Sequence, residues 1–367
     1  MELKLLKIVL AFALGLSVFI SINKISYWGL SYDEALFING AIHKDNITFI
    51  SKRYHGLVLM VFQYIGALKS WLYIPIFKLF SVNLLSIRLP MLIILYINYF
   101  LIFVIAKKYF NLKIVLALMI ILLTDLSYIQ LHKIDNGPNA LETLLKLFSL
   151  YVITRTSFRG QNVIVLLLLA LGIFNKLNFI WFVNAFYFTL FTCASFKYFS
   201  KENNEKNVKN LHLNKKITHL VNYAVLISFF VYLVIKQNVQ SNIPTTWNIL
   251  LSQFYSQMTN IVNAIGNFTY ENYFGWTSNH QYSFVTILIL LAFVFLGNIY
   301  FIVKNKIDFN DPHFYLLIFL FILICQLILT KEAFHLWHIL ILYPFIHLLI
   351  LNTFSIIFNK NHKTAVK

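Results

Sequence analysis

A succession of long apolar runs is the feature that most constrains how this chain can fold. With 59% hydrophobic and 12% charged residues among 367, a soluble domain could not cover its apolar surface. Lipid offers the backbone no hydrogen-bond partners, and about 20 apolar residues in a helix cross a bilayer. We predict an all-α, polytopic transmembrane protein with about ten spans, at 5–23, 89–106, 114–131, 139–154, 162–175, 178–196, 218–235, 284–303, 314–330 and 338–358.

The positions of lysine and arginine predict the orientation of these spans. Cytoplasmic loops carry an excess of basic residues, and with a cytoplasmic N-terminus such residues concentrate on that side, above all in the loop 197–217. This topology accounts for the formal charge of +17, so no nucleic-acid partner is expected. The prediction is one membrane domain, 1–358, with long outer loops at about 24–88 and 236–283, and a basic cytoplasmic tail, 359–367.

The first long outer loop is not simply hydrophilic. Residues 55–80 are apolar, with Lys69 and Lys78 interspersed and Pro75 interrupting the run. Such a segment suits amphipathic helices that lie along the outer interface. A further transmembrane hairpin is the rival interpretation.

Two adjacent carboxylates, Asp33 and Glu34, follow the first apolar run although acidic residues are scarce, at 13 in the chain. One interpretation is a solvated pair at a helix N-terminus, where negative charge is favoured. The other is a general base at the outer mouth of a span, with the second carboxylate orienting it.

The stretch HKIDNGPNALETLLKL, residues 132–147, places further polar groups at an outer mouth. Gly137-Pro138 predicts a chain break followed by a helix, which Asp135 would cap. Alternatively, Asp135 faces the same outer cavity as Asp33, with His132 and Lys133 adding positive charge. Glu142 and Lys146, four residues apart, are expected to pair within the span.

Two more outer positions carry cations. Lys176 lies between two apolar runs and is either a snorkelling turn residue or a phosphate contact. In KEAFHLWHILILYP, residues 331–344, Lys331, His335 and His338 share a broad helix face beside Glu332, and either anchor the interface or contact an anion. One metal ion cannot easily take all of these side chains, so no metal site is assigned, although a divalent metal cofactor is left open.

In their order these pieces resemble the C-type glycosyltransferase superfamily, in particular the protein O-mannosyltransferases and the lipid A aminoarabinose transferases. The resemblance covers about 1–200 and the last thirty residues of the membrane part. A Lys-x-Pro pattern common in the family after the acidic pair is replaced here by Lys52-Arg53-Tyr54-His55-Gly56, so acceptor specificity is not carried over. The matching residues are Asp33-Glu34-Ala35, Arg88-Leu89-Pro90, Asp135-Asn136-Gly137-Pro138, Lys176 and FHLWHILILYP.

The resemblance implies an inverting transferase that takes a sugar from a polyprenyl-phosphate donor at the extracytoplasmic face. Asp33 would be the base and Glu34 its support, among membrane lipids and with an unknown acceptor. Abundant Lys, Asn, Ile and Phe favour a bacterial inner membrane. A transporter of lipid-linked saccharide, favoured by Glu142 and Lys146, and a non-catalytic scaffold are the alternatives. The expected substrate-binding residues are Lys69, Arg88, His132, Asp135, Lys176, Lys331, His335 and His338.

Overall fold

The chain is described here from a computed structural model, in which helices predominate. They group into two compact units, 1–180 with 229–241, and 181–228 with 242–367. Each unit is described by itself. The structure describes residues 2–23, 25, 29–42, 52–55, 57–62, 64–135, 137–155, 160–200, 206–237, 292–302, 311–329 and 340–358.

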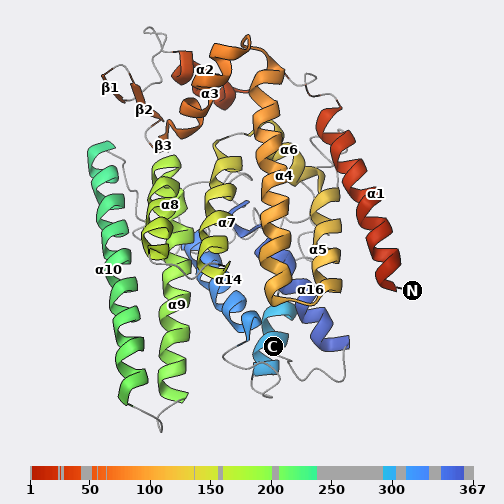
Figure 1. The fold of residues 1–367 in the computed structure, drawn as a ribbon, viewed down its shortest axis with the longest axis vertical. Coiled ribbons are helices and arrows are strands. Elements are labelled where there is room, and N and C mark those ends of the chain that lie inside the picture. Colours follow the sequence, from red (N-terminus) through yellow and green to blue (C-terminus); the bar gives the residue numbers. More distant parts are fainter. Residues whose placement is uncertain are drawn as a thin grey trace, which may run out of the picture. The chain divides into compact units, whose positions relative to one another are not determined.

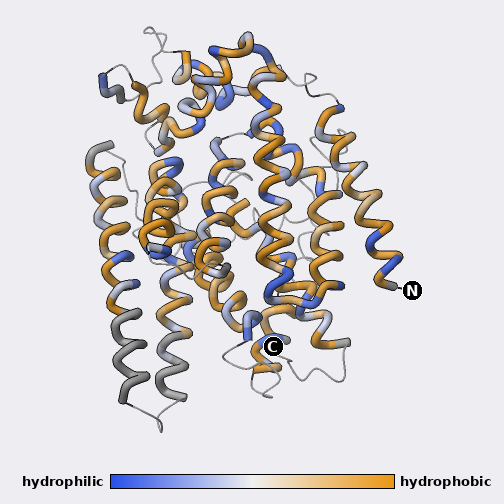
Figure 2. Tube along the Cα trace, in the orientation of Figure 1, coloured by the Kyte–Doolittle hydropathy of each residue, from blue (hydrophilic) through white to orange (hydrophobic). Residues whose placement is uncertain are grey.

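The first unit is built on long apolar helices (Figure 1). Helix α7 packs against both α4 and α8, and α1 packs against α5. Figure 2 shows that apolar residues cover most of α4, α5 and α8. The helices of this bundle are α1 (Glu2–Ile22), α4 (Leu84–Tyr109), α5 (Leu112–Thr124), α6 (Leu126–Lys133), α7 (Asn139–Arg155) and α8 (Gln161–Asn175), followed by the short helix η1 (Leu177–Phe179).

The segment between α1 and α4 forms a small subdomain at one end of this bundle (Figure 1). Its parts are α2 (Tyr32–Ile42), the strands β1 (Lys52–Tyr54), β2 (Leu57–Phe62) and β3 (Ile65–Gly66), and α3 (Leu68–Leu79). The strands form an antiparallel sheet in the order β1-β2-β3. A helix predicted in this loop is present as α3, and its position along the interface stays a prediction, but helix was wrong for the residues before it. LVLMVF pairs as a strand, and its Val58 and Met60 are buried on one face.

The third predicted span, 114–131, is broken in the middle. Helix α5 ends at Thr124, and the carboxylate of Asp125 accepts a hydrogen bond from the N–H of Tyr128, which caps the new helix α6. An aspartate at this position favours a helix start over a helix interior. Asp125 therefore lies between two helices rather than near the end of one span.

The second unit contains α9 (Ile180–Ser200), the part of α10 (Lys206–Gln237) up to Ser228, the helical residues Ala292–Ile302, α14 (Pro312–Leu329), η2 (Leu340–Leu342) and α16 (Phe345–Phe358). Its interior holds hydrogen-bonded side chains of Asn298, His313, Asn352 and Thr353. Asn184 of α9 accepts from Tyr223 of α10 and donates to Gln326 of α14.

Three helices among the described residues are long and apolar enough to cross a membrane: Leu3–Ile22, Leu84–Tyr109 and Ile217–Ile235. Shorter apolar helices occupy other predicted spans, including Leu112–Thr124, Gln161–Asn175 and Pro312–Leu327. Large apolar side chains on α1 are exposed, Phe12 to 73%. Surface of this kind on successive helices suits contact with lipid.

Candidate functional site

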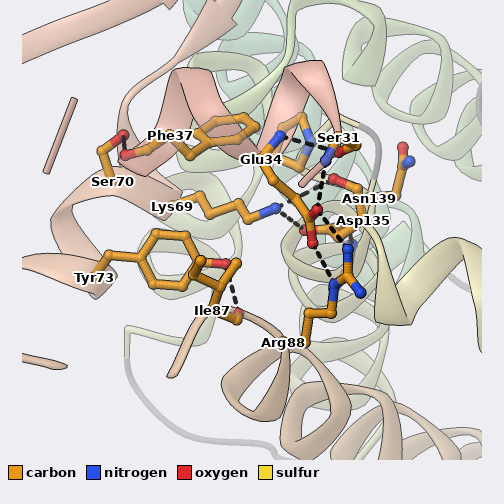
Figure 3. A network of polar contacts seen from close by, with 12 residues as sticks. Ser31, Glu34, Phe37, Lys69, Ser70, Tyr73, Ile87, Arg88, Asp135 and Asn139 are labelled. Atoms are coloured by element: carbon orange, nitrogen blue, oxygen red, sulfur yellow. Dashed lines mark hydrogen bonds and ion pairs between the residues drawn. The ribbon is translucent and has the colours of Figure 1, made fainter. Parts of the chain in front are cut away.

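A cluster of buried charged side chains lies in the first unit, where the small subdomain meets the helix bundle. Figure 3 shows its centre, with Glu34 of α2, Lys69 of α3, Arg88 of α4 and Asp135 of the α6–α7 connection close together. Each of these four side chains is at most 1% exposed. Buried charges are costly unless paired, so their partners decide what each can do.

Arg88 and Glu34 form a buried, bidentate ion pair. Arg88 Nε donates to Glu34 Oε1 at 2.8 Å, and Nη2 donates to Glu34 Oε2 at 2.9 Å. The same guanidinium donates to the backbone carbonyls of Ile25, at 2.6 Å, and Gly29, at 2.7 Å. Arg88 thus ties the start of α4 to the connection between α1 and α2 and to the first turn of α2.

Lys69 and Asp135 form the second buried pair. Lys69 Nζ lies 2.7 Å from Asp135 Oδ2 and 3.2 Å from the Asp135 carbonyl oxygen, over the ring of Phe37. Asp135 Oδ1 accepts from the N–H of Ala140, which confirms the predicted capping of α7. Asp135 has a φ of 51°, a strained conformation for a residue other than glycine. Burial raises the pKa of Asp135, and Lys69 opposes that shift.

Helix α3 is fixed by its polar side chains on either side of Lys69. Ser70 Oγ donates to the carbonyl of Phe37 at 2.9 Å, and Tyr73 Oη donates to the carbonyl of Ile87 at 2.8 Å. Burial, followed by the negative charges of Asp135 and Glu34, raises the pKa of Tyr73 well above its usual value. Tyr73 therefore remains a neutral hydrogen-bond donor that holds α3 to the residue before Arg88.

Lys176 reaches the same region from the end of α8. Its backbone bridges to Ile65 of β3, and Leu177 N–H donates to the carbonyl of Tyr64. Gly66 permits this contact, because a Cβ there would lie 2.0 Å from the Phe174 carbonyl oxygen.

The side chain of Lys176 points into α7. Lys176 Nζ lies 3.1 Å from Asn139 Oδ1 and 3.5 Å from Glu142 Oε2. The small sheet thus positions the lysine, and Lys176 supplies a partner for Glu142 that was expected only from Lys146. The phosphate contact predicted for Lys176 would have to form beside this carboxylate.

His132 and Lys133 end α6, and both are fully buried. His132 Nδ1 lies 2.8 Å from the Tyr128 carbonyl oxygen, while its Nε2 has no hydrogen-bond partner among the described residues. Lys133 Nζ donates to the carbonyl of Asn23 at 2.8 Å, at the point where α1 ends. Burial, and next the positive charge of Arg88, lower the pKa of Lys133 to about 8.

Asp33 differs from its neighbour Glu34. Both lie in the first turn of α2, but Asp33 is partly exposed whereas Glu34 is buried. Glu34 pairs with Arg88 and also accepts from the N–H of Ser31. The side chain of Asp33 has no hydrogen bond or ion pair with any residue that the structure describes. Of the two carboxylates, Asp33 is the one available to an incoming group.

The structure thus brings together most of the residues singled out from the sequence: Glu34, Lys69, Arg88, Asp135 and Lys176 share one buried region, with His132 at its α6 side. Lys331, His335 and His338 lie outside the described residues. Sequence reasoning missed Tyr73 and Asn139, which are common residue types without a local motif. It expected Lys133 to add positive charge but did not count it among the substrate-binding residues.

A metal site would need several ligands that converge on one point. Within the described ranges, no group of three or more His, Cys, Asp or Glu side chains could hold a metal ion. What the cluster offers instead is ammonium and guanidinium groups next to carboxylates. Such groups can bind an anion, orient a hydroxyl and accept a proton.

The apolar helices and this charged cluster define a polytopic membrane protein with an interior polar site. Residues 67–202 match the family model of the dolichyl-phosphate-mannose-protein mannosyltransferases, which confirms the resemblance over that range. Over that range the chain is similar to a family of C-type membrane glycosyltransferases. It includes Lys69, Arg88, Asp135 and Lys176, whereas Asp33 precedes it. No curated protein and no solved structure matches the chain.

Proposed function

We propose that this protein moves a sugar from a polyprenyl-phosphate donor to an acceptor hydroxyl at the extracytoplasmic face, with inversion and with Asp33 as the general base. The observation that carries the proposal is the contrast at the start of α2. Glu34 is buried and fully engaged, while Asp33 beside it is partly exposed and without a partner among the described residues. A base needs an accessible, unpaired carboxylate held on a rigid element.

The proposed reaction is a single displacement. The acceptor oxygen attacks the anomeric carbon, and its proton passes to the Asp33 carboxylate. The bond between the anomeric carbon and the phosphate oxygen breaks, and its electron pair leaves with the polyprenyl phosphate. Because attack and departure occur on opposite faces of that carbon, the anomeric configuration inverts.

Negative charge that develops on the departing phosphate has to be stabilised, and cations are concentrated around the start of α7. We assign this role to Lys69 and Lys176, whose ammonium groups are buried within reach of carboxylate and amide oxygens. Asp135 holds Lys69 in place, and His132 remains a candidate contact. Lys331, His335 and His338 remain proposed contacts from the C-terminal part of the chain.

Arg88 and Glu34 act, in this proposal, as positioning residues. The guanidinium has at least four of its N–H groups engaged by Glu34, Ile25 and Gly29, so little of it is left for a phosphate. Through these contacts Arg88 orders the residues that lead into α2, and it thereby orients Asp33. This replaces the phosphate contact that was expected of Arg88 from the sequence.

We propose the side of the membrane on which the site lies from the positions of the basic residues. A cytoplasmic N-terminus puts both termini and the lysine-rich segment 197–217 inside, which leaves the subdomain between α1 and α4 on the extracytoplasmic side. A bacterial inner membrane is the proposed location. The donor would then reach the cluster from the outer leaflet.

The test compares wild type, Asp33→Asn and Asp33→Glu in cell membranes, at matched amounts of folded protein. Lipid extracts and envelope glycans are analysed by mass spectrometry for a sugar-loaded polyprenyl phosphate and its product. We expect Asp33→Asn to accumulate the donor and lose one product, and Asp33→Glu, which keeps a carboxylate, to restore part of it.

Unchanged donor and product in Asp33→Asn would refute Asp33 as the base. A transporter of lipid-linked saccharide makes a different prediction for the same membranes. Loss of such a transporter would leave the sugar-loaded lipid trapped on the cytoplasmic leaflet, and substitutions at Glu142 and Lys146 would have a larger effect than those at Asp33.

A further inference from the structure

Lys133 is a buried cation that ends α6 and has no counter-ion among the described residues. Its side chain is 0% exposed, and its hydrogen bond to the Asn23 carbonyl uses one of three ammonium donors. No carboxylate within ion-pair distance of Lys133 occurs in the part of the chain that the structure describes. A buried ammonium in this state is unfavourable, and a pKa of about 8 still leaves it mostly charged at pH 7.

The other cations of the cluster each have a carboxylate beside them, and Lys146 and Lys176 share Glu142. Lys69 pairs with Asp135, Arg88 pairs with Glu34, and Lys176 lies 3.5 Å from Glu142. Lys146 is one helical turn from Glu142 on α7. Among the cations of this cluster that the structure describes, Lys133 is therefore the one with no carboxylate beside it.

Its position connects it to the proposed base. Lys133 donates to Asn23, and Arg88 donates to Ile25 and Gly29, so both cations hold the short connection that leads from α1 to Asp33. Lys133 also lies two residues before Asp135, the partner of Lys69. Lys133 is also close enough to Arg88 for the guanidinium charge to lower its pKa, so it belongs to the same charged cluster.

We propose that Lys133 binds a phosphate oxygen of the lipid donor, which supplies the missing negative charge. This inference rests on the proposed function and adds to it a residue that helps to hold the leaving group. The two ammonium donors not used by Asn23 are the ones that reach the phosphate. Binding gains from an already desolvated cation, because the cost of burying the charge is borne in the unliganded fold.

The same chemistry is present in the headgroups of anionic bilayer lipids, so the test has to separate two sources of phosphate. The full chain is placed in phosphatidylcholine nanodiscs, and binding of a polyprenyl phosphate is measured by native mass spectrometry and by the shift in Tm. The matching polyprenol, which lacks the phosphate, controls for the chain. Phosphatidylglycerol, added to a second set of nanodiscs, tests the headgroup.

Lys133→Met removes the charge and keeps the length of the side chain. The matched control is Lys78→Met, which removes an exposed lysine of α3. We expect Lys133→Met to weaken binding of polyprenyl phosphate by about tenfold to a hundredfold, with polyprenol binding unchanged and Tm equal to or above that of wild type. Lys78→Met should bind both lipids as wild type does.

Wild-type affinity for polyprenyl phosphate in Lys133→Met would overturn the inference. An equal loss of affinity for polyprenol would also overturn it, because that result indicates a structural role at Asn23. A Tm shift that depends on Lys133 and appears with phosphatidylglycerol alone would overturn it as well. If Lys133→Met does not fold, Lys133→Gln, which retains a donor for Asn23, is judged by the same criteria. Failure of wild type itself to bind polyprenyl phosphate would count against the proposed function instead.

Discussion

The two units of this chain both bury polar side chains among apolar helices, but they bury different kinds. In the first unit, eight of the eighteen buried polar side chains among the described residues are charged, and these eight come from segments far apart in sequence. In the second unit the buried polar side chains are mostly neutral, and Asp311, the exception, caps α14 through the N–H of His313. The charged set is Glu34, Lys69, Arg88, Lys133, Asp135, Glu142, Lys146 and Lys176, and the other set is Thr189, Asn298, Asp311, His313, Asn352 and Thr353.

The neutral network has the partners it needs. His313 Nε2 bonds Asn298 Oδ1, His313 Nδ1 accepts from Asn352 Nδ2, and Asn298 Nδ2 donates to Thr353 Oγ1 at 2.9 Å. This arrangement suits an uncharged imidazole. It joins three helical segments with amide and imidazole groups, which hold helices together in a membrane at modest cost.

Burying the charged set costs more free energy than the packing of helices requires. Replacing a buried ion pair by apolar residues of the same volume is often neutral or stabilising, so such a set is weak evidence for stability. The lesson is that the first unit retains charge where the proposed chemistry needs it, whereas the second unit joins its own apolar helices through neutral side chains. Four substitutions test this difference, ordered by the expected loss of stability.

The largest loss is expected for Arg88→Met. Glu34 would be left buried without its partner, and the carbonyls of Ile25 and Gly29 would lose their donor. Removing one member of a buried pair costs about 3–5 kcal/mol. Thermal unfolding in detergent, compared with Lys107→Met at the exposed end of the same helix, measures it. Glu34→Gln added to Arg88→Met should recover part of the loss, and a wild-type Tm for Arg88→Met alone would show that the pair is not formed.

How much of this was accessible from the sequence depends on distance along the chain. The apolar helices follow from local hydropathy, so the described helices lie close to the predicted spans. The strand at Leu57–Phe62 does not follow from hydropathy, because a short apolar run is compatible with a strand and with a buried helix. The break at Asp125 does not follow from hydropathy either, because a capping side chain interrupts an otherwise continuous apolar run there.

The residues of the charged cluster were singled out from the sequence by type, but their partners were not predicted. Glu34 and Arg88 are 54 positions apart, and Lys69 and Asp135 are 66 apart, so packing alone decides that these charges meet. Arg88 was expected to bind phosphate because its sequence position shows only its charge. That Glu34 already uses this charge becomes evident only in three dimensions.

A smaller loss is expected for Asn298→Ala in the second unit. The substitution removes the partners of His313 Nε2 and Thr353 Oγ1 in a buried place, which costs about 1–3 kcal/mol. Tyr300→Phe, at an exposed position of the same helix, is the control. Transfer activity per folded molecule should equal that of wild type. A specific loss of activity at unchanged stability would contradict the division between the two networks.

Tyr73→Phe should cost about 1 kcal/mol, since it deletes a single hydrogen bond, to the Ile87 carbonyl, and leaves the buried ring in place. The loss in Tm should exceed that of Tyr54→Phe, whose side chain is 64% exposed. Because Tyr73 holds the residue before Arg88, the effects of Tyr73→Phe and Arg88→Met should not be additive. Additive effects in a double-mutant cycle would show that α3 does not support the pair.

The smallest change in stability is expected for Asp33→Asn, within about 0.5 kcal/mol, because the carboxylate is partly exposed and has no partner among the described residues. Transfer should nevertheless fall by about 10²–10⁴ if Asp33 is the base. Glu34→Gln, one residue away, should instead lower Tm clearly, because Arg88 keeps its charge without a carboxylate. Its transfer activity should follow the folded fraction. Two adjacent carboxylates on one helical turn therefore separate catalysis from positioning. Equal effects of the two substitutions on Tm and on transfer would mean that the turn acts as a single structural unit.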